Sequence, residues 1–341
     1  MKLSLISNPP GQTMNTLKTS VISGHPATRG VLWAASLLVV FSMGISFASR
    51  AANTLNSARK FASPEEAVSA LRAATTLSDT NALREILGPA SDELLNPDRI
   101  QATNELKNFS AALAQTNQLV RSSDKLVILE VGDDLWPFPV PLAKMDGGWF
   151  FDTDIGKDEL LNRRIGNNEL ATIPVMRAYV DAQREYASAD HDGDGVLEYA
   201  QRLVSSPGKE DGLYWPPDLN GQLSPLGPLV AYAQAEGYSP ELRAEETEVE
   251  RGPYHGYYFK ILKRQGTHAA GGKYDYVING NMIAGFALVA WPAEYGGSGV
   301  MTFIVNQQGR VYQKDLGPST SKLAGKMDTF DPGPGWTLSP D

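Results

Sequence analysis

Apolar and polar residues follow two different periods along the chain, and the first of them is helical. Between residues 63 and 114, apolar positions such as Leu71 and Leu106 recur at helical spacing. Ser63, Pro64 and Glu66 are typical of a helix start, because serine caps the first turn, proline fits it and glutamate completes a capping box. The predicted helices begin at residue 64, span residues 80–87, and run from residue 96 to about residue 114.

After these helices the pattern becomes that of strands, with β-branched and aromatic residues between turn residues. We predict strands at residues 125–131, 136–142 and 149–151, the last of them after the turn at residues 146–148. This order of elements, with PEEAVSALRAATTLSDTNALREILGP at its start and WFFDTDIG at its end, resembles the NTF2-like class of small α+β domains. Such domains include both enzymes and binding proteins, so the resemblance predicts a fold and leaves the chemistry open.

A second helical pattern begins at Thr172, where Met176, Tyr179 and Val180 share one apolar face. Pro174 fits the first turn of this helix, although a kinked continuation from Asn168 is the alternative. A short helix is predicted at residues 198–203, before a passage rich in turn residues. The antiparallel strands that follow are predicted at residues 254–263, 273–278, 282–291, 300–305 and 310–314.

The long helix followed by a meander resembles the globular domains of type IV pilins and pseudopilins. The stretch AYVDAQREYASADHDGDGVLEYAQRL carries this resemblance. Together the two patterns predict an α+β protein with two domains. Residues 52–161 are expected to form an NTF2-like domain, and residues 162–341 a pilin-like domain in which a long helix packs on an antiparallel sheet.

The N-terminal region has the pattern of an export signal. Residues 30–49 contain no charged residue, and the residues before them include Lys2, Lys18 and Arg29 but no acidic residue. Small residues near Ala48 and Ala51 offer cleavage sites, so we expect a signal peptide of 51 residues and a periplasmic or secreted protein. The alternative is an uncleaved anchor, because the apolar run has about the length of a membrane span.

The net charge and the cysteine content exclude one class of partner and several classes of site. Removal of residues 1–51 takes away four basic residues and no acidic one, which changes the net charge from −9 to −13. Nucleic acid is therefore not expected as a partner. The chain has no cysteine, which excludes disulfides, thiolate nucleophiles and zinc sites built on thiolates.

Three aspartates at alternate positions suggest a cation site. Asp190, Asp192, Asp194 and Gly195 match the first half of an EF-hand calcium loop, in which glycine allows the sharp turn. The second half departs from this pattern, because Gln201 stands where a bidentate glutamate belongs. We expect a shortened loop that binds Ca²⁺.

Glu198 closes this loop, and the main-chain carbonyl of Val196 adds a further oxygen. The alternative interpretation is a solvated turn, because aspartate and glycine are common turn residues. The predicted metal ligands are Asp190, Asp192, Asp194, Val196 and Glu198.

Several long motifs closely resemble an uncharacterised secreted bacterial family, known as domain of unknown function twenty-nine fifty. This family has no assigned activity. The motifs are YVDAQREY, DGDGVLEYAQ, DGLYWP, SPLGPLV, PYHGYYFKIL and PAEYGGSGVMTFIVNQQGRVYQKDLG, all between residues 179 and 317.

The chain lacks a recognisable catalytic motif, so we expect a non-enzymatic exported protein that acts in binding or assembly at the cell envelope. Its expected partner is another envelope protein or a saccharide, the latter because tyrosines and tryptophans gather near the strands. The alternative is a hydrolase built on paired carboxylates. The candidate pairs are Asp152 with Asp154, and Glu198 with Asp194.

Overall fold

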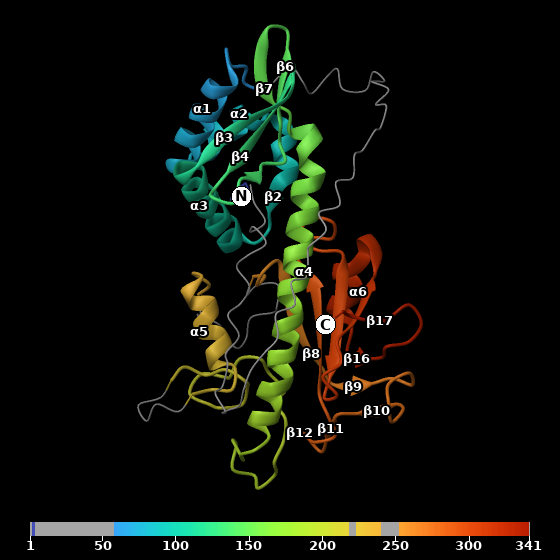
Figure 1. Cartoon of the computed structure of the whole chain (residues 1–341). Helices are drawn as coiled ribbons and strands as arrows, with labels where there is room; N and C mark the ends of the chain where they lie inside the picture. Colours follow the sequence, from blue (N-terminus) through green and yellow to red (C-terminus); the bar gives the residue numbers. More distant parts are fainter. Residues whose placement is uncertain (1, 4–57, 218–222, 240–251, 341) are drawn as a thin grey trace, which may run out of the picture.

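The computed structural model describes residues 2–3, 58–217, 223–239 and 252–340. Two lobes, each made of helices and antiparallel strands, share one long helix, α4 (Thr153–Tyr186) (Figure 1). Apart from Lys2 and Leu3, the predicted signal peptide lies outside the described residues. Within the described ranges, no helix has both the length and the apolar character needed to cross a membrane.

The first lobe packs three helices against a five-stranded antiparallel sheet. Helix α1 (Pro64–Thr76) begins as predicted, because Ser63 Oγ accepts a hydrogen bond from the Glu66 amide and the Glu66 carboxylate accepts one from Ala62. Helices α2 (Thr80–Leu87) and α3 (Arg99–Gln115) follow. The other elements here are the 3-10 helix η1 (Pro89–Leu94) and the paired short strands β1 (Lys2–Leu3) and β2 (Leu95–Asn96).

The sheet of this lobe has the order β3-β4-β6-β7, with β5 paired to β4. The prediction of one strand over residues 136–142 was wrong, because Pro137, Pro139 and Pro141 cannot donate to a continuous ladder. Fully buried Leu71, Phe109 and Leu129 lie in the core between helices and sheet. The strands are β3 (Asn117–Ser123), β4 (Leu126–Val131), β5 (Trp136–Pro137), β6 (Leu142–Met145) and β7 (Gly148–Phe151).

Helix α4 is longer than the sequence pattern indicated. It begins at Thr153 and continues through Pro174, so the predicted start at Thr172 was wrong. Its first turns pack in the core of the first lobe through Leu160, whereas Met176 and Tyr179 lie in the core of the second lobe. The domain boundary expected after residue 161 therefore falls inside a helix that belongs to both lobes.

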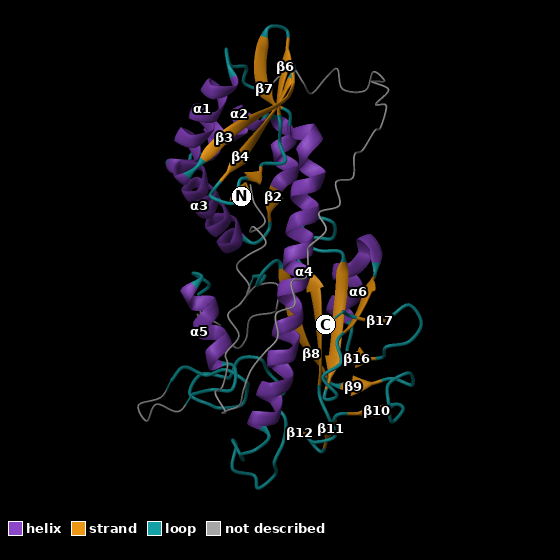
Figure 2. Cartoon of the chain, viewed as in Figure 1, coloured by secondary structure: helices purple, strands orange, loops and turns teal. Residues whose placement is uncertain are grey.

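The second lobe is built on a five-stranded antiparallel sheet of order β17-β15-β14-β13-β8. Figure 2 shows the strands of this lobe in orange beside the C-terminal half of α4. The interior strand β13, which lies between β14 and β8, is buried at every position, since both α4 and α6 pack against it. This explains why its sequence, ALVAWP, shows no alternation. The strands are β8 (Tyr257–Leu262), β13 (Ala287–Pro292), β14 (Met301–Asn306), β15 (Tyr312–Asp315) and β17 (Thr337–Leu338).

Smaller elements complete this lobe. The sequence patterns did not predict α5 and α6, although they indicated most of the strands. The helices are α5 (Gly227–Ala235), the 3-10 helix η2 (Gly317–Ser319) and α6 (Thr320–Lys326). The short strands are β9 (Arg264–Gln265), β10 (Tyr274–Asp275), β11 (Val277–Ile278), β12 (Asn281–Met282) and β16 (Thr329–Phe330).

The short helix predicted at residues 198–203 is absent, because this segment is extended. The Tyr199 amide donates to the Met282 carbonyl of β12 at 2.8 Å. The Ala200 amide and carbonyl both bond to the side-chain amide of Gln183, each at 2.8 Å. These contacts to α4 and β12 replace the bonds that a helix would have made within the segment. Overall, the α+β class predicted from the sequence is confirmed.

Candidate functional site

The aspartate loop follows the C-terminal end of α4 and brings three of the predicted ligands together. Oxygens of Asp190, Asp192 and Asp194 lie within 4.8 Å of one another, and all three side chains are exposed. Asp190 accepts hydrogen bonds from the amides of Gly193 and Gly195, at 2.8 and 2.9 Å. These amide hydrogen bonds lower the pKa of Asp190. The loop thus holds three carboxylates close together.

Val196 and Glu198, the other two predicted ligands, connect the loop to its surroundings. The Val196 amide donates to Asp194 at 2.7 Å, and the Glu198 carboxylate accepts from the Met282 amide at 2.8 Å. Asp194 also accepts from the Asn281 side chain at 2.7 Å. Glu198 and Asp194 therefore both bind β12, and neither is a free acid or base directed at an open site.

The other predicted carboxylate pair lies at the start of α4. Asp152 is half-buried, and burial, followed by the charge of Asp154, raises its pKa. Asp154 lies 3.4 Å from the Lys157 ammonium group. Both carboxylates line a pocket of only about 20 Å³, which has room for a water molecule but not for a substrate.

A larger cavity of about 200 Å³ lies in the second lobe. Val175 and Tyr179 of α4 form one wall, Leu229 and Val230 of α5 form another, and Phe259 of β8 lines it as well. None of the described residues that line the cavity carries a formal charge. The arrangement is typical of a binding site for an apolar ligand.

Helix α5 is unusual because its sequence, GPLVAYAQA, is almost entirely apolar, yet none of its residues is buried. Leu229, Val230 and Ala233 line the cavity, and all three are partly exposed. Tyr232, which does not line it, is 47% exposed. An apolar helix in this position gains burial only when the cavity next to it is filled.

Three of the tyrosine hydroxyl groups around the cavity are used for bonds elsewhere. Tyr179 donates to the Ala287 carbonyl at 3.1 Å, and Tyr257 donates to the Met301 carbonyl at 2.9 Å. Tyr238 donates to Asp98 at 2.8 Å. Burial, followed by the nearby carboxylate of Asp98, raises the pKa of Tyr238. These hydroxyl groups therefore remain neutral donors with fixed partners.

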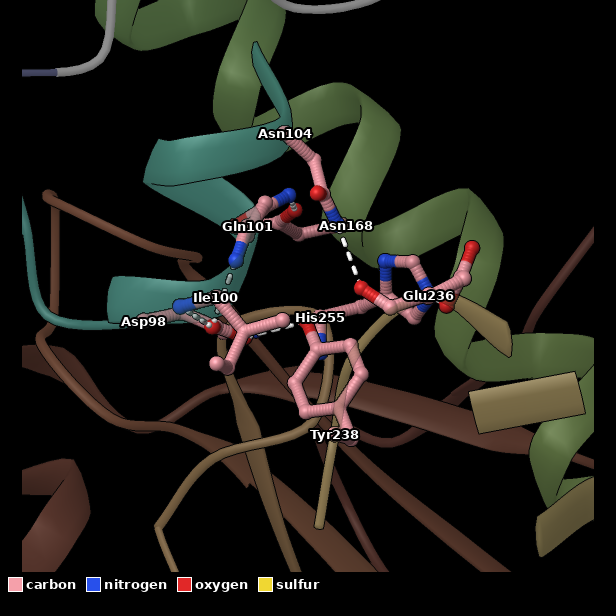
Figure 3. Close-up of polar contacts among 9 residues, drawn as sticks. Asp98, Ile100, Gln101, Asn104, Asn168, Glu236, Tyr238 and His255 are labelled. Atoms are coloured by element: carbon pink, nitrogen blue, oxygen red, sulfur yellow. Dashed lines mark hydrogen bonds and ion pairs between the residues drawn. The ribbon is translucent and has the colours of Figure 1, made fainter. Parts of the chain in front are cut away.

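One end of the cavity, at Tyr238, lies against the contact between the two lobes, which we call the junction and define by Asp98, Gln101, Arg164, Asn168 and Gly256. Figure 3 shows Asp98, Gln101 and Asn168 of this junction together with Tyr238. Asp98 caps α3 with one carboxylate oxygen, which accepts from the Gln101 amide at 2.9 Å. Its other oxygen accepts from Tyr238 and, at 3.2 Å, from the Gly256 amide of the second lobe. A single buried carboxylate thus joins both lobes.

Asn168 and Arg164 of α4 add further bonds across the junction. Asn168 accepts from Gln101 at 2.5 Å and donates to the Ser298 carbonyl at 2.8 Å. Arg164, only 1% exposed, donates to the carbonyls of Leu94 at 2.6 Å and of Gly297 at 3.3 Å. The guanidinium group therefore bonds to main-chain oxygens of both lobes.

Two details show how closely the junction is packed. A Cβ atom on Gly256 would lie 2.5 Å from the Asn168 side chain, and the φ of Gly256 is +74°, so only glycine fits here. Glu105 is buried behind Arg164, and burial raises its pKa to about 8. Arg164 opposes this rise, whereas Asp98 adds to it.

The sequence patterns missed both the cavity and the junction. An apolar run directly after Pro228 was the signal for α5, since proline fits a first helical turn. The predicted cluster of aromatic side chains near the strands does include Tyr257 and Tyr258, which line the cavity. For Asp98, Arg164 and Asn168 no such signal existed, because isolated polar residues on helices usually face solvent.

The structure thus defines a two-lobed α+β protein in which a shared helix runs from a polar junction into a lobe with an apolar cavity. The chain belongs to the family described as Protein of unknown function (DUF2950), whose model matches residues 58–338. This match confirms the family predicted from the sequence motifs. No curated protein and no solved structure matches the chain, so the NTF2-like and pilin-like assignments stay predictions.

Proposed function

We propose that this chain is an exported, non-enzymatic envelope protein that binds an apolar ligand in the cavity between α4, α5 and β8. The observation that carries the proposal is the cavity itself, which measures about 200 Å³ and has no charged lining residue among those described. Export is expected from the uncharged run at residues 30–49.

The lining favours an apolar ligand over the saccharide expected from the sequence. A saccharide requires several hydrogen-bonding groups, and tyrosines such as Tyr179 and Tyr257 already donate to main-chain carbonyls. An apolar molecule needs no such partners and would bury the inner face of α5. Binding is also favoured over hydrolysis, because the carboxylates proposed for catalysis either bond to β12 or line a pocket of about 20 Å³.

The test is whether the protein carries a ligand from its own envelope. The full chain should be produced in its native host, recovered without detergent, extracted with organic solvent and analysed by mass spectrometry. We expect an apolar compound in the extract of the wild type and of Ala231→Phe, but not of Ala233→Phe, in which phenylalanine fills the cavity. Extracts without any enriched compound in all three proteins would contradict the proposal.

We further propose that the aspartate loop binds Ca²⁺ and stabilises the end of α4. Three clustered carboxylates supply hard oxygen ligands, and relief of their mutual repulsion favours the bound ion. Because the twelfth EF-hand position lacks glutamate, we expect a dissociation constant on the order of 10⁻⁴ to 10⁻³ M.

Thermal unfolding with and without calcium tests this second proposal. A free calcium concentration about a hundredfold above the dissociation constant should add about 2.7 kcal/mol to the free energy of unfolding. Asp192→Asn should remove the effect, whereas Asp181→Asn, an exposed aspartate on α4, should retain it. An unchanged melting temperature in calcium, with no binding by calorimetry, would leave only the solvated turn.

A further inference from the structure

Given the binding function proposed above, the charges around the cavity indicate which charge the ligand carries. Among the lining residues that the structure describes none is basic, so none of these offers an anionic ligand a counter-ion. Two carboxylates lie close by instead. Asp98 accepts a hydrogen bond from Tyr238, and Glu236, at the C-terminal end of α5, lies 3.0 Å from His255.

These carboxylates contribute to the raised pKa values of two tyrosines that line the cavity. Burial, followed by the charge of Glu236, raises the pKa of Tyr254. For Tyr258, burial and then Asp98 raise the pKa. An anion placed in the cavity would lose its hydration and would also be repelled by the same two carboxylates, whereas a neutral molecule would meet neither penalty.

The volume of the cavity limits the size of the ligand. Cavities of about 150 Å³ lined by Leu, Ile and Phe bind benzene and otherwise stay dry. The cavity here measures about 200 Å³, so it accommodates one or two rings or an aliphatic group of similar volume. A long acyl chain would extend well beyond it.

We propose that the cavity binds a small, neutral, aromatic or branched aliphatic molecule and discriminates against anions of the same shape. This inference rests on the binding function proposed above and adds the size and charge of the ligand. The cavity beside α5, the absence of charge among its described lining residues, and the carboxylates of Asp98 and Glu236 carry it.

The experiment uses 2-naphthalenemethanol and 2-naphthoate, which share a ring system and differ in charge at neutral pH. Calorimetric titration of the full chain should give a dissociation constant at least tenfold lower for the alcohol. Ala233→Phe, which fills the cavity from α5, should weaken binding of the alcohol at least tenfold. Ala231→Phe, on the exposed side of the same helix, should change it less than twofold.

The possible outcomes separate this inference from the proposed function. If 2-naphthoate binds as tightly as the alcohol and Ala233→Phe blocks both, the cavity is a binding site but the inferred neutral selectivity is wrong. If neither probe binds, or if Ala233→Phe has no effect on either, both ideas are overturned. Val175→Phe fills the cavity from α4 and serves as a second variant, with circular dichroism to verify the fold of each protein.

Discussion

The junction and the cavity lie next to each other, yet they are built in opposite ways. In the junction, charged and polar side chains such as Asp98 and Arg164 are buried and bonded to both lobes. In the cavity, apolar side chains of α5 remain partly exposed beside unfilled space. A buried polar network has few alternative arrangements, whereas an apolar surface adapts to whatever fills it.

This difference suggests that the two sides of the cavity have different roles. The junction fixes α4 and the start of β8 relative to the first lobe, so one side of the cavity is rigid. Helix α5, with no buried residue, forms the side that a ligand can rearrange.

Arg164→Ala should destabilise the protein most. Removal of the guanidinium group leaves the Leu94 and Gly297 carbonyls of the junction without this donor, and each acceptor left unpaired costs about 1–3 kcal/mol, so we expect a loss of about 3–5 kcal/mol in the free energy of unfolding. Urea denaturation measures this loss. Arg184→Ala, which removes a 56% exposed side chain from the same helix, should cost at most about 1 kcal/mol. Equal losses for the two variants would contradict the role assigned to the junction.

Glu105→Gln should change how stability depends on pH. The pKa of Glu105 is about 8 in the folded protein, against an ordinary value of 4.5, so between these values the folded state holds a proton that the unfolded state releases. The contribution of this group is therefore fully present below pH 4.5 and lost as pH rises through 8, at up to about 1.4 kcal/mol per pH unit.

Glutamine cannot ionise, so the variant should gain stability relative to the wild type as pH rises from 5 to 8. Urea denaturation at each pH measures the difference between the two proteins. Parallel profiles would show that Glu105 titrates alike in the folded and unfolded states.

Leu229→Ala, on the cavity side of α5, should have the smallest effect. Leu229 is only partly buried, so we expect a loss below about 1 kcal/mol in the free energy of unfolding without ligand. Leu288→Ala, in the 1% exposed leucine that lines the same cavity from β13, should cost about 2–5 kcal/mol. A similar loss in both variants would show that α5 is part of the rigid core.

Local signals in the sequence were sufficient for much of the fold. The capping residues at Ser63 and Glu66 predicted the start of α1, because the bonds they make lie within one turn. The repeated aspartates likewise predicted a tight loop, and three of the proposed ligands do gather there. Strands such as β4, β8 and β14 were also found, within a few residues of their observed bounds, whereas β3 was missed and the strand predicted at residues 282–291 is divided into β12 and β13.

The remaining features of the fold depend on packing between segments that are far apart in the sequence. Pro174 indicated a helix start near Thr172, but the packing of Leu160 in one core and Tyr179 in the other favours a single helix through the proline. The segment at residues 198–203 became extended for a similar reason, since Gln183 and β12 offered it partners.

The sequence by itself determined the family, the α+β class and the position of the aspartate loop, because each depends on residues close together in the chain. The burial of Asp98, Arg164 and Asn168 between the lobes follows from the tertiary structure alone. The same is true of the position of α5 beside an apolar cavity. An isolated polar residue or a short apolar run has the same sequence whether it contacts water or another element. The burial of Asn168 and Asp98 depends on segments more than a hundred residues away.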